Sequence, residues 1–183
     1  MVTVDQISHV ERVAREFTHR ILLVTALTAA HRVDEQASTE GNRRLTLLGK
    51  SLIDLVLHDA WMVRDGSRGD GLSEHRYCEL ADLSKAEAND IAVSLVSNAN
   101  LAEIAVKSGI DKCIEASPRQ RHRPLTHGVL AKSIKAIVCA SWLDSDKDLR
   151  VADGALARLS AYGSVIPTAL VESDLAAEQP PIR

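Results

Sequence analysis

Aromatic side chains are scarce in this sequence of 183 residues, where Phe, Trp and Tyr together make up 3%. Leu, Ile, Val and Ala must therefore fill the core, and these residues suit helix-on-helix packing better than a β-sandwich. Proline is absent before Pro118, so no proline interrupts a helix in the first two-thirds of the chain. No clear alternation of apolar and polar residues indicates a strand. The sequence therefore predicts an all-α fold.

Cysteines are also few, and Cys78, Cys113 and Cys139 are too far apart for a CxxC or Cys/His zinc site. Their odd number and wide spacing predict reduced, buried thiols in a cytosol-like compartment. No run of about 18 apolar residues occurs, which predicts that the chain does not bind a membrane through a spanning helix. The N-terminal segment up to Phe17 carries three acidic residues and lacks the apolar core of a signal peptide. We therefore expect an intracellular protein, cytoplasmic or mitochondrial.

The length suits one domain with a short tail. We expect residues 1–163 to form a helical domain and residues 164–183, which include Gln179-Pro180-Pro181, to be a disordered tail. Asn42 is predicted to cap a helix and Gly109 to end one. Apolar spacing predicts these helical stretches: Val4 to His31 (one helix or two), Leu45 to Val63, Ser73 to Leu83, Lys85 to Ser108, Leu125 to Leu143 and Leu149 to Tyr162.

Three short segments resemble motifs of the ribonuclease III catalytic domain. Residues 42–52 read N-R-R-L-T-L-L-G-K-S-L, against the family's N-E-R-L-E-F-L-G-D-(S/A)-(V/L). Residues 94–102 read S-L-V-S-N-A-N-L-A, against A-L-V-S-N-x-x-L-A. Residues 129–137 read V-L-A-K-S-I-K-A-I, against I-L-A-D-x-x-E-A-(I/L), and W-L-D follows where the family has Y-L-D. The order and spacing of the three segments resemble that family from about Phe17 to Tyr162.

In that family, carboxylates at four positions hold a divalent metal, usually magnesium, which activates water against an RNA phosphodiester. An ammonium group has no lone pair to donate and repels a metal ion. The resemblance therefore implies a ribonuclease III-like helical domain that binds no metal or cofactor and is not a metal-dependent ribonuclease. The ligand positions here carry Thr46, Lys50, Lys132 and Lys135, and a supporting acidic position carries Arg43.

The lysines themselves form a candidate site. Lys132 and Lys135 are three residues apart and share one helix face, and the resemblance implies that this face meets Thr46 and Lys50. Three interpretations are open: structural pairing with acids such as Asp54, which is expected to pair with Lys50; binding of an anion such as an RNA phosphate; or a lysine of lowered pKa acting as base or nucleophile on a small molecule. His127 precedes the third motif and is a candidate to line the same pocket.

Weaker candidates lie elsewhere in the chain. Residues 117–124, S-P-R-Q-R-H-R-P, hold Arg119, Arg121 and Arg123, which either contact RNA phosphates or form a solvated loop. His58 and Asp59 are either an acid/base pair or a polar helix edge. The net charge of −3 is not that of a typical nucleic-acid-binding domain, so any RNA contact must be local.

Leu47, Leu48 and Leu52 keep the apolar character of the face through which family members dimerise, which predicts a homodimer or a heterodimer with a related chain. The leading interpretation is a catalytically dead ribonuclease III-like protein with a non-hydrolytic, RNA-associated or structural role, such as in a ribosomal particle. One alternative is a repurposed enzyme acting on a small-molecule ligand in the former nuclease cleft. Another is a dominant-negative partner of an active ribonuclease III.

Overall fold

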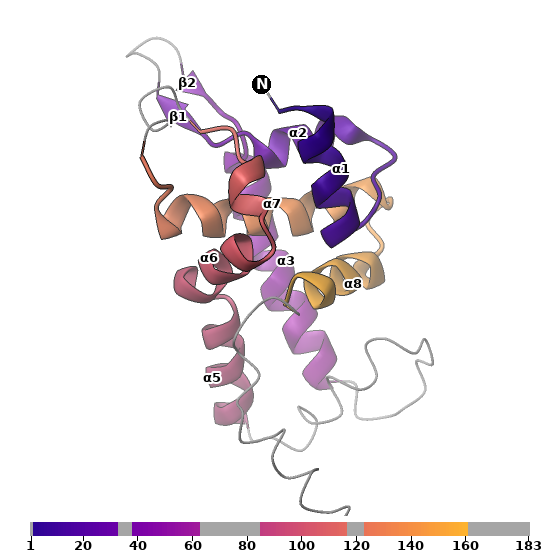
Figure 1. Ribbon diagram of the computed structural model, residues 1–183. Coiled ribbons are helices and arrows are strands. Elements are labelled where there is room, and N and C mark those ends of the chain that lie inside the picture. Colours follow the sequence, from indigo (N-terminus) through magenta and orange to yellow (C-terminus); the bar gives the residue numbers. More distant parts are fainter. Residues whose placement is uncertain (1, 33–37, 63–84, 117–122, 161–183) are drawn as a thin grey trace, which may run out of the picture.

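The computed structural model describes residues 2–32, 38–62, 85–116 and 123–160 (Figure 1). These residues are mostly helical, as the scarcity of aromatic residues and prolines predicts. A two-residue antiparallel ladder, which the sequence did not indicate, joins β1 (His31–Arg32) to β2 (Ser38–Thr39). The helices are α1 (Val4–Val13), α2 (Arg20–Leu27), α3 (Arg43–Met62), α5 (Lys85–Leu95), α6 (Asn98–Lys107), the 3₁₀ helix η1 (Ile110–Cys113), α7 (His127–Asp144) and α8 (Leu149–Ser160).

Helix α7 forms the centre of the fold and packs against α2, α3, α6 and α8 (Figure 1). Every residue from Ala136 to Ser141 is fully buried, because helices cover α7 on most sides. The apolar residues found on all sides of this segment are those expected of such a central helix. Helix α3 crosses α7 and is richer in leucine, with six in 20 residues against two in 18, but part of its apolar surface remains exposed, as described below for the candidate site.

Two predicted helical stretches are each divided in the structure. Residues 4–31 form α1 and α2, and the chain between them turns so that Phe17 is buried. The expectation of one helix over residues 85–108 is wrong, because α5 ends at Leu95 and α6 begins at Asn98. Ser97 caps α6, since its side chain accepts a hydrogen bond from the Asn100 amide at 3.2 Å.

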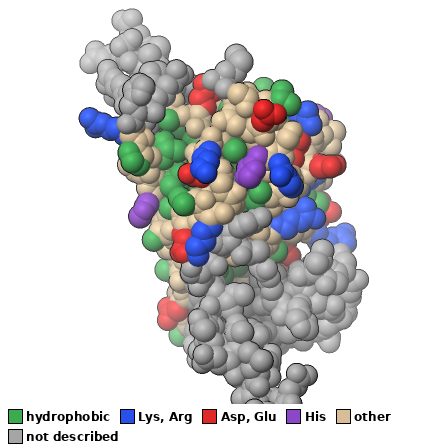
Figure 2. All heavy atoms as spheres, in the orientation of Figure 1, with side chains coloured by type: hydrophobic (Ala, Val, Ile, Leu, Met, Phe, Trp, Pro, Cys, Tyr) green, Lys and Arg blue, Asp and Glu red, His purple; other side chains and the backbone are tan. Residues whose placement is uncertain are grey.

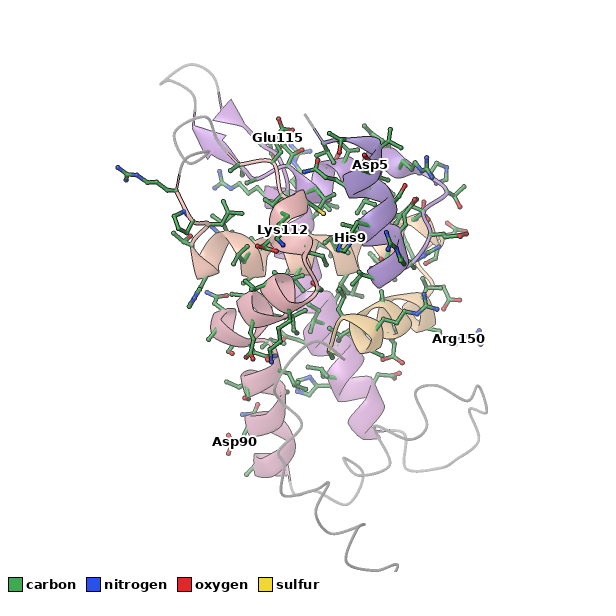
Figure 3. All side chains as sticks on the ribbon, viewed as in Figure 1. Asp5, His9, Asp90, Lys112, Glu115 and Arg150 are labelled. Atoms are coloured by element: carbon green, nitrogen blue, oxygen red, sulfur yellow. The ribbon has the colours of Figure 1, made fainter. Side chains whose placement is uncertain are left out.

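Two glycines take left-handed backbone conformations where the chain must turn. Gly109 has φ +75° immediately after Ser108, the C-cap of α6, as predicted. His9 of α1 reaches this turn, and its Nε2 lies 2.8 Å from the Ser108 carbonyl oxygen (Figure 3). Gly41 has φ +46°, and a Cβ there would lie 2.5 Å from the Thr28 carbonyl oxygen. Only glycine therefore fits the turn that leads into α3.

Cys113 and Cys139 are free and buried, as predicted, whereas Cys78 lies outside the described residues. Burial raises the pKa of the Cys139 thiol to about 11. Burial and the nearby Asp111 also raise the pKa of Cys113. Neither thiol is therefore a ready nucleophile at neutral pH.

Several predictions concern residues outside the described part of the chain, namely the helix over residues 73–83 and the tail after residue 163. No helix among the described residues is long and apolar enough to cross a membrane.

Candidate functional site: a lysine cluster where α3 crosses α7

The start of α3 is fixed by a buried asparagine. Asn42 lies at the N-cap position, as predicted, because its carbonyl accepts the Thr46 amide at 2.8 Å. Its side-chain Nδ2 donates to the Ala26 carbonyl on α2 at 3.1 Å and to the Ser133 hydroxyl on α7 at 3.2 Å. A single side chain thus ties three helices together. This explains why an asparagine opens the first motif.

Gly49 sets how closely α3 and α7 approach each other. A Cβ at this position would lie 2.0 Å from the Lys135 carbonyl oxygen and 3.3 Å from the Cys139 Cβ. Since no side chain fits there, the two backbones are in direct contact. Lys50 follows this glycine in the sequence, and Lys135 supplies the backbone on the opposite side. The crossing therefore brings lysines from both helices together.

The hydroxyl of Thr46, one turn before Lys50, is part of the same crossing. Its Oγ1 donates to the Lys132 carbonyl oxygen at 3.1 Å. The side chain at this position therefore serves as a link between α3 and α7.

Lys135 lies at the centre of the cluster and is half-buried, whereas Lys50 and Lys132 are exposed. Burial is the largest cause that lowers the pKa of the Lys135 ammonium group below its ordinary value of 10.5, and repulsion from Lys50 follows. Asp54 raises this pKa and Lys132 lowers it further, with a net lowering. The structure thus brings together the three lysines that the sequence analysis had selected.

Sequence reasoning gave no role to Asn98, which the structure adds to the site. The Lys135 ammonium donates to the Asn98 side-chain oxygen at 3.2 Å. Asn98 is the first residue of α6, directly after the capping Ser97. The only signal in the sequence was its place in the second motif, which indicates importance without naming a partner.

The acids that were expected to neutralise the lysines do so only in part. Among the ion pairs of the described residues, none joins Lys50 to Asp54, so that expected pairing is wrong. Asp54 influences Lys135 instead, and its backbone carbonyl contacts the His58 ring. Glu103 pairs with Lys107 at 2.6 Å on its own helix. Counting only the part of the chain that the structure describes, the cluster therefore keeps an excess of positive charge.

The other candidate residues lie at the surface. His127 is the exposed first residue of α7, more than one turn before Lys132. Arg123 is exposed just ahead of it, while Arg119 and Arg121 lie outside the described residues. The exposed His58 ring contacts the Asp54 carbonyl, as expected of a polar helix edge. In the view of Figure 2, acidic and basic side chains are interspersed over the described surface.

The leucines of the first motif differ in exposure. Leu47 and Leu48 are 75% and 42% exposed, and Leu55 on the same helix is 54% exposed. Leu52 is only 4% exposed and packs in the core. The inclusion of Leu52 in a dimerisation face is therefore wrong, because a helix that is apolar on most sides does not show which side faces the core.

Asp144 is the acidic residue of the third motif that remains, and it is structural. Its buried carboxylate accepts the Thr18 and His19 amides at 3.0 and 2.7 Å, and it pairs with Arg15 at 3.3 Å. Burial by itself would raise the pKa of Asp144. The hydrogen bonds from His19 and Thr18, together with the Arg15 charge, outweigh burial and lower it. This carboxylate holds the turn between α1 and α2 against the end of α7.

The donor set at the crossing does not fit the magnesium ion that the family resemblance implies. Magnesium requires oxygen ligands, but three of the four positions carry ammonium groups, and Thr46 donates its hydroxyl proton to a carbonyl. The described residues also contain no group of three or more His, Cys, Asp or Glu side chains placed to hold a metal ion.

Comparison with known proteins gives the family context. No family model matches the chain. Ribonuclease 3 of Shewanella piezotolerans is 30% identical over 148 residues, which are 78% of this chain and 57% of that protein. Ribonuclease 3 of Shewanella pealeana gives the same values. The chain thus spans a little over half the length of these curated relatives.

Solved structures agree with this relationship. The nuclease domain of ribonuclease III from Campylobacter jejuni matches with a TM-score of 0.67 and 21% identity, over 87% of this chain and 99% of that domain. A second structure of the same domain gives a TM-score of 0.65 and 20% identity, over 91% and 99%. The chain is ribonuclease III-like. This ribonuclease III-like fold places Lys50, Lys132 and Lys135 together at the crossing of α3 and α7.

Proposed function

We propose that this ribonuclease III-like protein does not hydrolyse RNA and has an RNA-associated or structural role as a dimer. The observation that carries the proposal is the lysine cluster. Ammonium groups occupy three of the four positions where the family resemblance implies carboxylate ligands. Because a cation repels a metal ion, the residues of this site suit an anionic ligand better than a metal-activated water.

Association with RNA is supported by the local excess of positive charge in a chain whose net charge is −3. Non-specific binding to nucleic acid depends on contacts between lysine or arginine and phosphates. Lys50 and Lys132 are exposed at the crossing, and the exposed Arg123 precedes α7. These side chains supply such contacts without requiring a metal.

Dimer formation is supported by the exposed leucines of α3. Leu47, Leu48 and Leu55 are large apolar side chains at the surface of the described part of the chain, and such surfaces often serve in association. The C. jejuni nuclease domain is described as having a region involved in dimer formation. We expect α3 to contribute to an equivalent contact here.

The first test compares cleavage and binding of an RNA duplex of about 20 base pairs over a range of salt concentrations. We expect no cleavage with or without Mg²⁺. We also expect binding that weakens as salt rises, measured by fluorescence anisotropy. Specific cleavage that depends on Mg²⁺ would refute the non-hydrolytic role. Absence of binding near physiological salt would refute the RNA-associated role.

The oligomeric state is tested separately by sedimentation of the Leu47→Glu/Leu48→Glu double variant. We expect wild type to sediment as a dimer and the variant as a monomer, since burying carboxylates in an apolar interface is costly. Ile21→Glu is the matched control, because Ile21 is 69% exposed on a different helix. A wild-type monomer would contradict the proposed dimer. A stable mixed dimer with an active ribonuclease III-like chain would instead favour a dominant-negative partner.

A repurposed small-molecule enzyme is the second candidate, favoured by the lowered pKa of Lys135. A lysine whose pKa is lowered is more often neutral and therefore more nucleophilic. We expect such an enzyme to lose activity in Lys135→Arg, since arginine keeps the charge but is not a nucleophile. Trapping by borohydride with carbonyl compounds gives the direct measurement. Equal labelling of wild type and Lys135→Arg would remove this candidate.

A further inference from the structure

The lysine cluster is anchored by contacts from three helices. Backbone contact at Gly49 holds α3 against the turn of α7 that carries Lys135. The Thr46 hydroxyl adds a hydrogen bond to the Lys132 carbonyl, and Asn98 of α6 accepts a hydrogen bond from the Lys135 ammonium. The backbone positions of the three lysines are therefore fixed relative to one another, which favours binding because less freedom is lost.

The charges of the cluster are not balanced within the described residues. Asp54 is the one carboxylate that acts on Lys135, while Lys50 and Lys132 repel it. Like charges held together in this way oppose folding. Sites that break a stability rule in this way are often functional, because a ligand compensates for the unfavourable charge.

The exposure of the side chains shows how a ligand would approach. Lys50 and Lys132 are exposed, whereas Lys135 is half-buried and donates a hydrogen bond to Asn98. Lys135 uses one of its three donors on Asn98, which leaves two donors for a ligand. An anion with several oxygen atoms that enters from solvent would meet the exposed lysines first and Lys135 last.

We propose that Lys50, Lys132 and Lys135 bind a phosphate group directly, so that fixed ammonium groups do the work of a divalent cation and binding is independent of metal. The inference rests on the proposed function in that the expected source of the phosphate is the RNA backbone. A phosphate has the tetrahedral set of anionic oxygens that several ammonium groups bind together. Free phosphate or pyrophosphate shares this chemistry, and the test separates these sources.

The test measures binding of an RNA duplex by anisotropy in EDTA and in Mg²⁺, for wild type and for the Lys50→Gln/Lys132→Gln/Lys135→Gln variant. We expect wild type to bind equally well in EDTA, within about twofold, and the variant to lose about tenfold or more. We also expect the slope of log K against log salt to become shallower by about 0.9, since the three lysines together neutralise one phosphate. Lys112→Gln is the matched control, because Lys112 is an exposed lysine on η1, which packs against α1 and α6. Circular dichroism checks folding, and Lys50→Gln serves as a single variant at an exposed position.

The outcomes separate this inference from the proposed function. RNA binding that is unchanged in the triple variant would overturn the site while leaving the RNA-associated role intact. Binding that requires Mg²⁺ would overturn metal independence. If RNA does not bind but calorimetry detects pyrophosphate binding that is lost in Lys50→Gln, the phosphate site stands and the RNA source is wrong. If neither ligand binds wild type, the inference fails.

A second arm reverses the charges. The Thr46→Glu/Lys50→Asp/Lys132→Asp/Lys135→Glu variant places carboxylates at all four positions. We expect it to bind Mn²⁺, detected by electron paramagnetic resonance, and to lose RNA binding in EDTA. RNA binding by this variant in EDTA that equals wild type would contradict the direct role of the lysines.

Discussion

Helix α7 carries charged residues near its middle and at its C-terminal end, and their surroundings differ sharply. Near its middle, Lys135 lies with Lys50 and Lys132, and both of these repel its charge. At its end, Asp144 is completely buried and receives two backbone amides, the His19 ring and the Arg15 guanidinium group. The end of the helix holds a neutralised charge, and its middle holds charges in excess among the described residues.

The difference separates a structural charge from a candidate binding site. A buried charge persists when donors around it replace the lost water, as they do for Asp144. The lysines have no comparable set of partners among the described residues, apart from Asn98 and the influence of Asp54. We therefore expect changes at Asp144 to affect stability most and changes at the lysines to affect binding most.

The largest expected effect is the loss of the Asp144 carboxylate. Asp144→Ala leaves the Thr18 and His19 amides without their acceptor and Arg15 without its carboxylate partner, and we expect a loss of about 3–5 kcal/mol in the free energy of unfolding. Urea denaturation measures it. Asp90→Ala is the control, because Asp90 on α5 points into solvent (Figure 3) and should change stability by less than about 0.5 kcal/mol. Similar losses in both variants would break the comparison.

The crossing that holds the lysines is tested by Gly49→Ala. The added Cβ would lie 2.0 Å from the Lys135 carbonyl oxygen. Because this contact forces the helices apart, we expect the free energy of unfolding to fall by about 2–3 kcal/mol. Gly154→Ala is a matched control in α8, where a Cβ would meet nothing within 4 Å. Because alanine favours a helix more than glycine does, this substitution should raise the free energy of unfolding by about 0.5–1 kcal/mol. Opposite signs for the two variants in thermal denaturation would confirm the close approach.

The pH dependence of stability sharpens the comparison at the Asp144 end. Its folded pKa lies below the ordinary 3.8, so its contribution is fully present above that pH. It is lost as pH falls through the folded value. We expect the stability gap between wild type and Asp144→Asn, about 1–2 kcal/mol at pH 7, to shrink as the pH falls below 3.8. Urea denaturation over this pH range tests it, and a gap that grows on acidification would be inconsistent with a lowered pKa.

The smallest expected effect on stability is at the lysine cluster. Lys135→Met removes repulsion from Lys50 and Lys132 and adds an apolar side chain. Because solvent screens these charges, the free energy of unfolding should rise by no more than about 0.5 kcal/mol. The same substitution at Lys112, on η1, is the control and should have no effect. A clear loss of stability in Lys135→Met would show that the Asn98 hydrogen bond is structural and would weaken the case for a binding site.

Several features of the fold were predictable because they depend on local sequence. The apolar periodicity predicted α3, α7 and α8, and the predicted ends lie within two residues of those in the structure. The spacing of Lys132 and Lys135 predicted that they share one face of their helix. The breaks in the other helical stretches were not predictable. The turn before α2 depends on hydrogen bonds from Thr18 and His19 to Asp144, which is far along the chain.

The candidate site shows the same division. The family resemblance selected Lys50, Lys132 and Lys135 and implied their convergence. The i,i+4 spacing along α3 assigned Asp54 to Lys50, whereas Asp54 influences Lys135, and Asn98 was given no role. The partner of a side chain often lies on another helix. Sequence spacing predicts distances between residues of one helix but not between residues of different helices. The exposure of a side chain was equally hard to predict. Leu47 and Leu52 are both leucines of one apolar helix, but Leu47 faces solvent and Leu52 faces the core.

By itself, the sequence determined the all-helical class, a helix over most of residues 125–143 and the reversal of charge at the positions implied by the family. Composition and helical periodicity act over a few residues, so they can be read along the chain. Only the tertiary structure decided which charges are neutralised. The glycine contact at Gly49 and the buried Asn42 bring α2, α3 and α7 together, and that packing leaves the lysines in excess while it surrounds Asp144 with donors.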